Sequence, residues 1–136
     1  MMNDKLDPLA LYIHIPFCHN ICSYCDFPKV FYHEEQAKKY VAALLKEVDT
    51  LPHKKLKSIY FGGGTPLSLP YELLEKIIIK IEEKFDLSSL KEFTVETTPE
   101  AIDINHLSLL KKHGVNRISI GVQTFKKLSY LNRHHT

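Results

Sequence analysis

The chain has 136 residues, of which 44% are hydrophobic and 25% are charged. This length suits a single domain, and the composition excludes a disordered chain, a collagen and a coiled coil. With 18 basic and 16 acidic residues the net charge is +2, too balanced to indicate nucleic acid or an anionic membrane as the partner. No apolar run reaches the roughly 18–20 residues of a membrane helix, and residues 1–17 lack the pattern of a signal peptide. We therefore expect no transmembrane segment and a cytoplasmic location.

The first half of the chain alternates strand-like and helical patterns. Residues 9–15, LALYIHI, have the composition of a strand. Residues 34–51 place their apolar side chains on one face at helical spacing and their charges on the other, which predicts an amphipathic helix. Residues 57–61, KSIYF, predict a second strand, which the glycines at 62–64 are expected to break.

The second half repeats this alternation. Pro70 stands at the expected first position of a helix whose apolar stripe extends to Phe85. Residues 91–96 predict a third strand. Asp103 is a suitable N-cap for a third helix, and Gly114 is well placed to end it. Residues 116–122, NRISIGV, predict the fourth strand.

A last, weaker helical pattern begins at about Lys126, so the elements follow the order β-α-β-α-β-α-β-α. This order predicts an α/β fold of parallel strands joined by right-handed crossovers. Four βα units are half of an eight-unit barrel, which takes roughly 250 residues. A partial barrel, a piece of a longer barrel and a small open sheet all fit this pattern.

The unusual residues of the chain cluster where the predicted strands end. Cysteines follow the first strand, and GGGTP at 62–66 follows the second. Glu96 ends the third strand and Gln123 follows the fourth. Parallel α/β folds bind ligands at the carboxyl ends of their strands, so these four groups are expected on one rim.

All three cysteines of the chain, Cys18, Cys22 and Cys25, lie in the segment CHNICSYC with the spacing CX3CX2C. An odd number of cysteines packed so closely is a poor disulfide framework and favours metal or redox chemistry. A four-iron cluster normally takes four thiolates. With three, one iron would lack a protein thiolate and could bind a small molecule.

Other interpretations of these signals stay open. Zinc could take the three cysteines together with His14, His19 or His33, and three unligated buried thiols are a second alternative. The GGGTP segment is neither a P-loop nor a GXGXXG motif, and by itself it could be a plain turn. Glu96 could bind a ribose hydroxyl or an amine, or simply be solvated.

The segment LYIHIPFCHNICSYCDF resembles the radical S-adenosylmethionine (SAM) superfamily. More narrowly, it is similar to the oxygen-independent coproporphyrinogen III oxidase family. FGGGTP, VETTPE and RISIGVQTF follow in the order of that family, so the resemblance runs from about Tyr12 to Phe125. The CX3CX2C loop preceded by YIHIPF is highly specific, whereas the other motifs are informative only in combination.

The resemblance implies a [4Fe-4S] cluster held by the three cysteines, whose fourth iron chelates the amino and carboxylate groups of SAM. It implies that Tyr12 and Tyr24 border the cofactor, with Tyr24 near the adenine. One-electron reduction then cleaves SAM to methionine and a 5′-deoxyadenosyl radical that abstracts hydrogen. The cofactor carries this chemistry, and the protein positions it and excludes water.

The resemblance also assigns the remaining contacts with SAM. Gly63, Gly64 and Thr65 would hold its methionine end. Glu96 and Gln123 would contact it from the third and fourth strands. Arg133 also corresponds to a family contact, although the segment between Gln123 and Arg133 is about two residues shorter than the family pattern.

Within the family, Cys25 is followed by Asp26 and Phe27 rather than another cysteine, and only 11 residues precede Tyr12. Both features resemble the heme chaperone (HemW) branch more than the oxidase, so the expected partners are SAM, heme or coproporphyrinogen III, and an electron donor. Thr98 stands where the glutamate motif usually has asparagine.

Family members are much longer and complete a six-unit partial barrel with a C-terminal domain. Residues 1–136 are therefore expected to form the N-terminal part of a radical SAM core. The open edge of the fourth strand predicts self-association. A zinc-binding structural module and an inactive fragment are the remaining alternatives.

Overall fold

A computed structural model describes residues 9–18, 30–31 and 34–120 of the chain. Four parallel strands form the main sheet in the order β1-β4-β5-β6. Their bounds are Leu9–Ile15 for β1, Leu56–Gly63 for β4, Glu92–Thr97 for β5 and Arg117–Ile120 for β6. The helices are α1 (Glu34–Thr50), α2 (Tyr71–Lys84) and α3 (Ile104–Lys112). The short strands β2 (Phe17–Cys18) and β3 (Val30–Phe31) pair in parallel beside this sheet.

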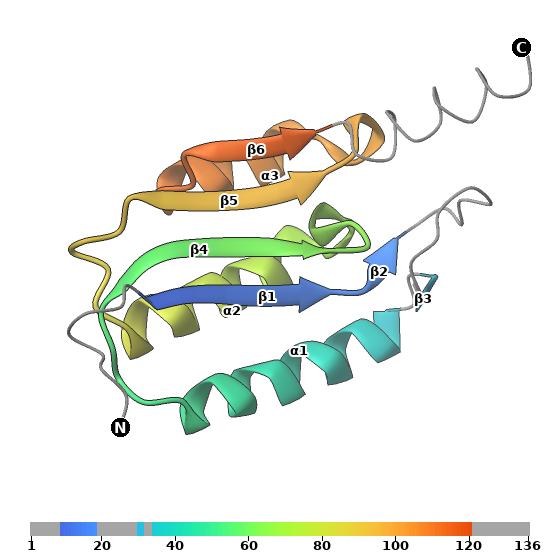
Figure 1. Cartoon of the computed structure of the whole chain (residues 1–136). Coiled ribbons are helices and arrows are strands. Elements are labelled where there is room, and N and C mark those ends of the chain that lie inside the picture. Colours follow the sequence, from blue (N-terminus) through green and yellow to red (C-terminus); the bar gives the residue numbers. More distant parts are fainter. Residues whose placement is uncertain (1–8, 19–29, 32–33, 121–136) are drawn as a thin grey trace, which may run out of the picture.

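The three helices form one layer on one face of the sheet (Figure 1). Helix α2 packs against both α1 and α3. This follows from the topology, because the four strands neighbour one another in chain order and right-handed crossovers then place every helix on the same side. The structure is therefore an open stretch of (β/α) units, as the element order predicted. Its other face is not covered by any helix that the structure describes.

The core lies between the sheet and the helix layer. Every second residue of each strand points toward the helices. On this face the rings of Phe61 and Phe93 pack with centroids 5.6 Å apart. The predicted apolar stripes of α1 and α2 face this core, with Val41 and Ile77 fully buried. Burial of such side chains stabilises the fold by about 1.5–3 kcal/mol each.

Several predicted boundaries differ from the structure by a few residues. Strand β4 continues through Gly62 to Gly63 instead of stopping at Phe61, because both glycines remain in register with β1. Pro70 is the N-cap of α2 rather than its first residue. The short 3-10 helices Pro66–Ser68 and Pro99–Ala101 were not predicted.

The third helix confirms its predicted caps. The side chain of Asp103 accepts a hydrogen bond from the amide of His106, and Gly114 follows the helix with φ of 88°. The helix predicted from Lys126 lies outside the described residues. Among the helices described, none is long and apolar enough to cross a membrane. Strands β1 and β6 are the outer strands of the described sheet, and self-association through β6 stays a prediction.

Candidate functional site

The carboxyl ends of β1, β4 and β5 bring the predicted site residues to one edge of the sheet (Figure 1). Cys18 ends β2, which follows β1 after one residue. Gly63 and Gly64 lie at the end of β4, and Glu96 lies near the end of β5. The expectation of a common rim is therefore confirmed for the first three strands.

The segment GGGTP (residues 62–66), called the glycine loop below, is hydrogen-bonded to the backbone that leads into Cys18. The amide of Gly64 donates to the carbonyl oxygen of Ile15, and the amide of Thr65 donates to that of Phe17, both at 2.8 Å. A Cβ atom on Gly64 would lie 2.7 Å from the Phe17 oxygen. A Cβ atom on Gly63, whose φ is 112°, would lie 2.6 Å from the Ile15 oxygen. Side chains are excluded at both positions because the two backbones approach so closely.

Thr65 occupies the N-cap position of the 3-10 helix Pro66–Ser68 and is 4% exposed. The hydroxyl of Ser68 donates to the carbonyl oxygen of Phe17 at 3.0 Å, which adds a side-chain contact to the same junction. Thr65 therefore has a clear role in attaching the glycine loop to β2. A direct contact between Thr65 and SAM stays a prediction.

The sheet face opposite the helices carries a cluster formed by Tyr12, Tyr60, Gly62 and Glu96. The rings of Tyr12 and Tyr60, which are in register on β1 and β4, stack with centroids 5.9 Å apart and an interplanar angle of 18°. The Tyr60 hydroxyl donates a hydrogen bond to Oε2 of Glu96. A Cβ atom on Gly62 would lie 2.9 Å from the Tyr12 hydroxyl and 3.0 Å from Oε1 of Glu96. The two predicted residues Tyr12 and Glu96 thus converge over a glycine.

Tyr60 and Gly62 were not predicted as members of this cluster. In a strand, side chains two residues apart point to the same face. Tyr60 and Gly62 therefore share one face of β4, while Phe61 points to the core. Strand alternation counted back from the glycines was the signal that could have found Tyr60.

The electrostatics of the cluster keep both phenols protonated. Burial, together with the hydrogen bond to the Glu96 carboxylate, raises the pKa of Tyr60 to about 12. Burial and the negative charge of Glu96 also raise the pKa of Tyr12 above its usual value. Near neutral pH the two hydroxyls are therefore hydrogen-bond donors, whereas an ionised carboxylate accepts only.

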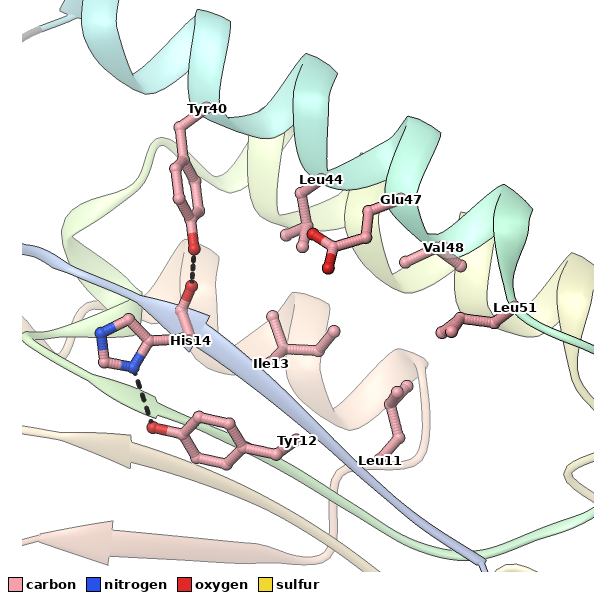
Figure 2. Close-up of a pocket in the computed structure, with 9 residues that line it drawn as sticks. All are labelled: Leu11, Tyr12, Ile13, His14, Tyr40, Leu44, Glu47, Val48 and Leu51. Carbon is pink, nitrogen blue, oxygen red and sulfur yellow. Dashed lines mark hydrogen bonds between the residues drawn. The ribbon is translucent and has the colours of Figure 1, made fainter.

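His14 lies beside this cluster on β1. Its Nδ1 atom is 3.1 Å from the Tyr12 hydroxyl, and its backbone carbonyl accepts a hydrogen bond from Tyr40 of α1 (Figure 2). A pocket of about 170 Å³ opens between β1 and α1, lined mainly by apolar side chains and by Glu47. Among the residues that the structure describes, no group of three or more histidine, cysteine or acidic residues could hold a metal ion.

The predicted metal site lies largely beyond what the structure describes. The backbone of Cys18 pairs with Phe31, so the segment 19–29 starts and finishes at adjacent short strands. The other predicted site residues that lie outside the described residues are Cys22, Tyr24, Cys25, Gln123 and Arg133. Whether an iron–sulfur cluster fits is therefore judged from its ligand atoms. Three cysteine thiolates within eight residues suit such a cluster.

The fit of SAM can be tested on the described residues. Gly62 forms a cradle beside Oε1 of Glu96 and the Tyr12 hydroxyl that a Cβ atom would fill, whereas at Gly63 the backbone of Ile15 already takes up that space. Glu96 offers an acceptor for hydroxyl or amine donors, and the phenol rings offer flat apolar surfaces. This donor and shape pattern would fit the polar nucleoside of SAM.

Comparison with known proteins supports this interpretation. The profile of the Radical SAM superfamily matches residues 12–136. The heme chaperone HemW of Lactococcus lactis is 43% identical over 131 residues, 95% of this chain and 35% of the relative. HemW of Bacillus subtilis is 46% identical over 122 residues, 86% of this chain and 32% of the relative.

The oxygen-independent coproporphyrinogen III oxidase of Salmonella typhimurium is 33% identical over 125 residues, 88% of this chain and 27% of the relative. The solved coproporphyrinogen III oxidase (HemN) of Escherichia coli, described as a radical SAM enzyme, superposes with a TM-score of 0.77 at 30% identity. That superposition covers 83% of this chain and 27% of the solved chain. The chain thus spans about a third of the length of the curated relatives it matches. On its motifs, its fold and this match, the chain belongs to the Radical SAM superfamily.

Proposed function

We propose that this chain is the N-terminal part of a radical SAM core that binds a [4Fe-4S] cluster through Cys18, Cys22 and Cys25 and SAM at the adjacent strand ends. The observation that carries the proposal is the attachment of the glycine loop to Ile15 and Phe17 at 2.8 Å. It joins the glycine loop to the backbone that leads into Cys18, the first of the three cysteines of the chain, at the same end of the sheet as Glu96.

In this proposal the residues of this chain bind SAM and orient it. The backbone around Gly63 and Gly64 would receive the methionine end of SAM, as the family motif FGGGTP implies. Glu96 accepts hydrogen bonds from donors of the nucleoside, and Tyr12 borders it. Tyr24, Thr65, Gln123 and Arg133 are proposed as further contacts. When bound together, the cluster and SAM supply one-electron chemistry at the sulfonium of SAM.

We further propose a role in heme trafficking, like that of a heme chaperone. Its support is the greater identity to the two HemW relatives than to the oxidase. The second candidate is oxidative decarboxylation of coproporphyrinogen III, which the structural likeness to HemN favours. Heme or coproporphyrinogen III is accordingly the proposed tetrapyrrole partner, and an electron donor is a further proposed partner.

The cluster is tested by purifying the chain without oxygen, reconstituting it with iron and sulfide, and recording EPR spectra after dithionite. A reduced [4Fe-4S] signal that shifts when SAM is added supports the proposal. Serine variants of Cys18, Cys22 and Cys25, tested singly, should each lose the signal, because one remaining pair of thiolates cannot hold the cluster in a SAM-binding state. A colourless protein containing zinc would contradict the proposal at the metal itself.

The tetrapyrrole role is tested on the same cluster-loaded chain. A heme chaperone should bind hemin, seen as a new Soret band, without consuming SAM. An oxidase should form protoporphyrinogen IX from coproporphyrinogen III and release methionine. Each outcome supports one candidate against the other.

A further inference from the structure

Tyr60 connects the two predicted site residues Tyr12 and Glu96. Its ring stacks against the ring of Tyr12, and its hydroxyl donates to Oε2 of Glu96. The pairing of β4 with β5 sets Tyr60 opposite Thr94, two residues before Glu96 on the same face. The stacked ring fixes the direction of the hydroxyl, and the hydroxyl in turn fixes the carboxylate.

The two oxygens of the Glu96 carboxylate have different neighbours. Oε2 accepts the hydrogen bond from Tyr60. Oε1 lies on the side of Gly62, where a Cβ atom would come within 3.0 Å of it and within 2.9 Å of the Tyr12 hydroxyl. One carboxylate oxygen is thus occupied within the protein, and the other borders the glycine cradle.

Holding the Glu96 carboxylate in one position should strengthen the binding of a ligand. A glutamate side chain has several rotatable bonds, and restricting them when a ligand binds weakens the affinity. A carboxylate already held by a phenol loses less freedom on binding. Removing that hold should weaken the binding of a hydroxyl or amine donor by about three- to ten-fold.

We propose that Tyr60 is a positioning residue that holds one oxygen of Glu96, so that the other oxygen is presented to the donor groups of SAM beside Tyr12 and Gly62. The inference rests on the proposed function, because SAM is the ligand in question. Tyr60 acts through Glu96 and needs no contact of its own with the ligand.

A double-variant cycle tests this role on the whole chain loaded with its cluster. Tyr60→Phe removes only the hydroxyl, and Glu96→Ala removes the group that it holds. Tyr71→Phe, a tyrosine on α2 outside the cluster, is the matched control. Affinity is measured by anaerobic equilibrium dialysis of labelled SAM, and iron content and the melting temperature are measured on the same samples.

The expected result is a three- to ten-fold weaker affinity for Tyr60→Phe, with unchanged iron content, and no change for Tyr71→Phe. In the Glu96→Ala background, Tyr60→Phe should cause no further loss. If the two losses multiply, Tyr60 acts independently of Glu96 and the inference is overturned, as it is if Tyr60→Phe binds like the parent chain. A parent chain that holds the cluster but does not bind SAM overturns the proposed function itself, and the inference with it.

Discussion

The amide of Thr65 donates a hydrogen bond to the carbonyl oxygen of Phe17 at 2.8 Å, and Phe17 directly precedes the first cysteine. The residue that follows the three glycines is therefore attached to the residue that precedes the first cysteine. Ser68 reinforces the attachment by donating its hydroxyl to the same oxygen. A change in the glycine loop should consequently be transmitted to Cys18, more than 40 residues earlier in the chain.

Gly64→Ala should disturb this junction. The new Cβ atom would lie 2.7 Å from the carbonyl oxygen of Phe17, and a backbone atom cannot move aside as a side chain can. We expect a loss of about 1–3 kcal/mol in the free energy of unfolding and a lower iron content after reconstitution. Urea unfolding and iron analysis measure the two effects.

Gly114→Ala is the matched control for Gly64→Ala. Gly114 has φ of 88° but nothing within 4 Å of an added Cβ atom. Backbone strain alone should lower the free energy of unfolding of Gly114→Ala by about 1–2 kcal/mol, which is similar to the loss expected for Gly64→Ala. The iron content of Gly114→Ala should stay that of the parent chain. Equal iron contents in the two variants would show that the junction with Phe17 does not govern the cysteine loop.

Gly62→Ala should separate stability from ligand binding. The three atoms nearest to its Cβ atom would belong to the side chains of Tyr12, Tyr60 and Glu96, which can shift. The crowding is partly offset because alanine is favoured over glycine inside a strand, so we expect the stability to change by no more than about 1 kcal/mol. The shifted carboxylate should weaken SAM binding about ten-fold or more. A variant that melts like the parent chain and binds SAM equally well would contradict the proposed cradle.

The strands, the helices and the common rim were predictable because they depend on local patterns. Asp103 and Gly114 are recognised caps, and alternation predicts which side of a strand is buried. The extension of β4 through Gly62 was not predictable, because it depends on pairing with His14 of β1, 48 residues earlier.

The candidate site was likewise predictable only in part. Tyr12 and Glu96 were predicted from motifs, whereas the contact between Tyr60 and Glu96 joins neighbouring strands 36 residues apart in the chain. The partner of such a residue is set by the register of the sheet. Strand alternation could place Tyr60 on the same face as Gly62. No pattern along one strand specifies the register, so the contact of Tyr60 with Glu96 could be identified only in the folded chain.

Asp103 should stabilise the chain through both carboxylate oxygens. Oδ1 accepts from the amide of His106 at 2.8 Å, and Oδ2 lies 2.9 Å from Nδ1 of the same residue. Nε2 of His106 lies 2.7 Å from the carbonyl oxygen of Leu69, which connects α3 to the segment before α2. Asp103→Ala should therefore cost about 1–2 kcal/mol in urea unfolding, and Asp103→Asn, which can still cap the helix, should cost less. Equal losses would show that the cap contributes nothing.

The bonded amide of His106 also lowers the pKa of Asp103. A carboxyl group with a depressed folded-state pKa stabilises the fold above its unfolded pKa, and that contribution is lost as the pH falls. The difference in stability between the parent chain and Asp103→Ala should therefore shrink toward about pH 3. A difference that stays constant down to that pH would contradict the assignment.

His113 should make stability fall as the pH rises through the neutral range. Its Nδ1 atom lies 2.7 Å from Glu82 and its Nε2 atom 3.0 Å from Glu75, while Lys112 also contacts Glu75 at 3.4 Å. Burial acts to lower the pKa of His113, but the two carboxylates outweigh it and raise that pKa above its ordinary value. A raised folded-state pKa means that the folded chain binds the proton more tightly than the unfolded chain.

The contribution of His113 is consequently complete below the unfolded pKa of about 6.5 and is lost as the pH rises through the higher folded-state value. The melting temperature of His113→Gln should lie furthest below that of the parent chain near about pH 5.5, and the two should converge by about pH 9. His53→Gln, at an exposed position, serves as the control, and near about pH 5.5 its melting temperature should lie closer to that of the parent chain than that of His113→Gln does. A difference in melting temperature between His113→Gln and the parent chain that widens with rising pH would mean that the neutral imidazole, rather than the charged one, joins α3 to α2.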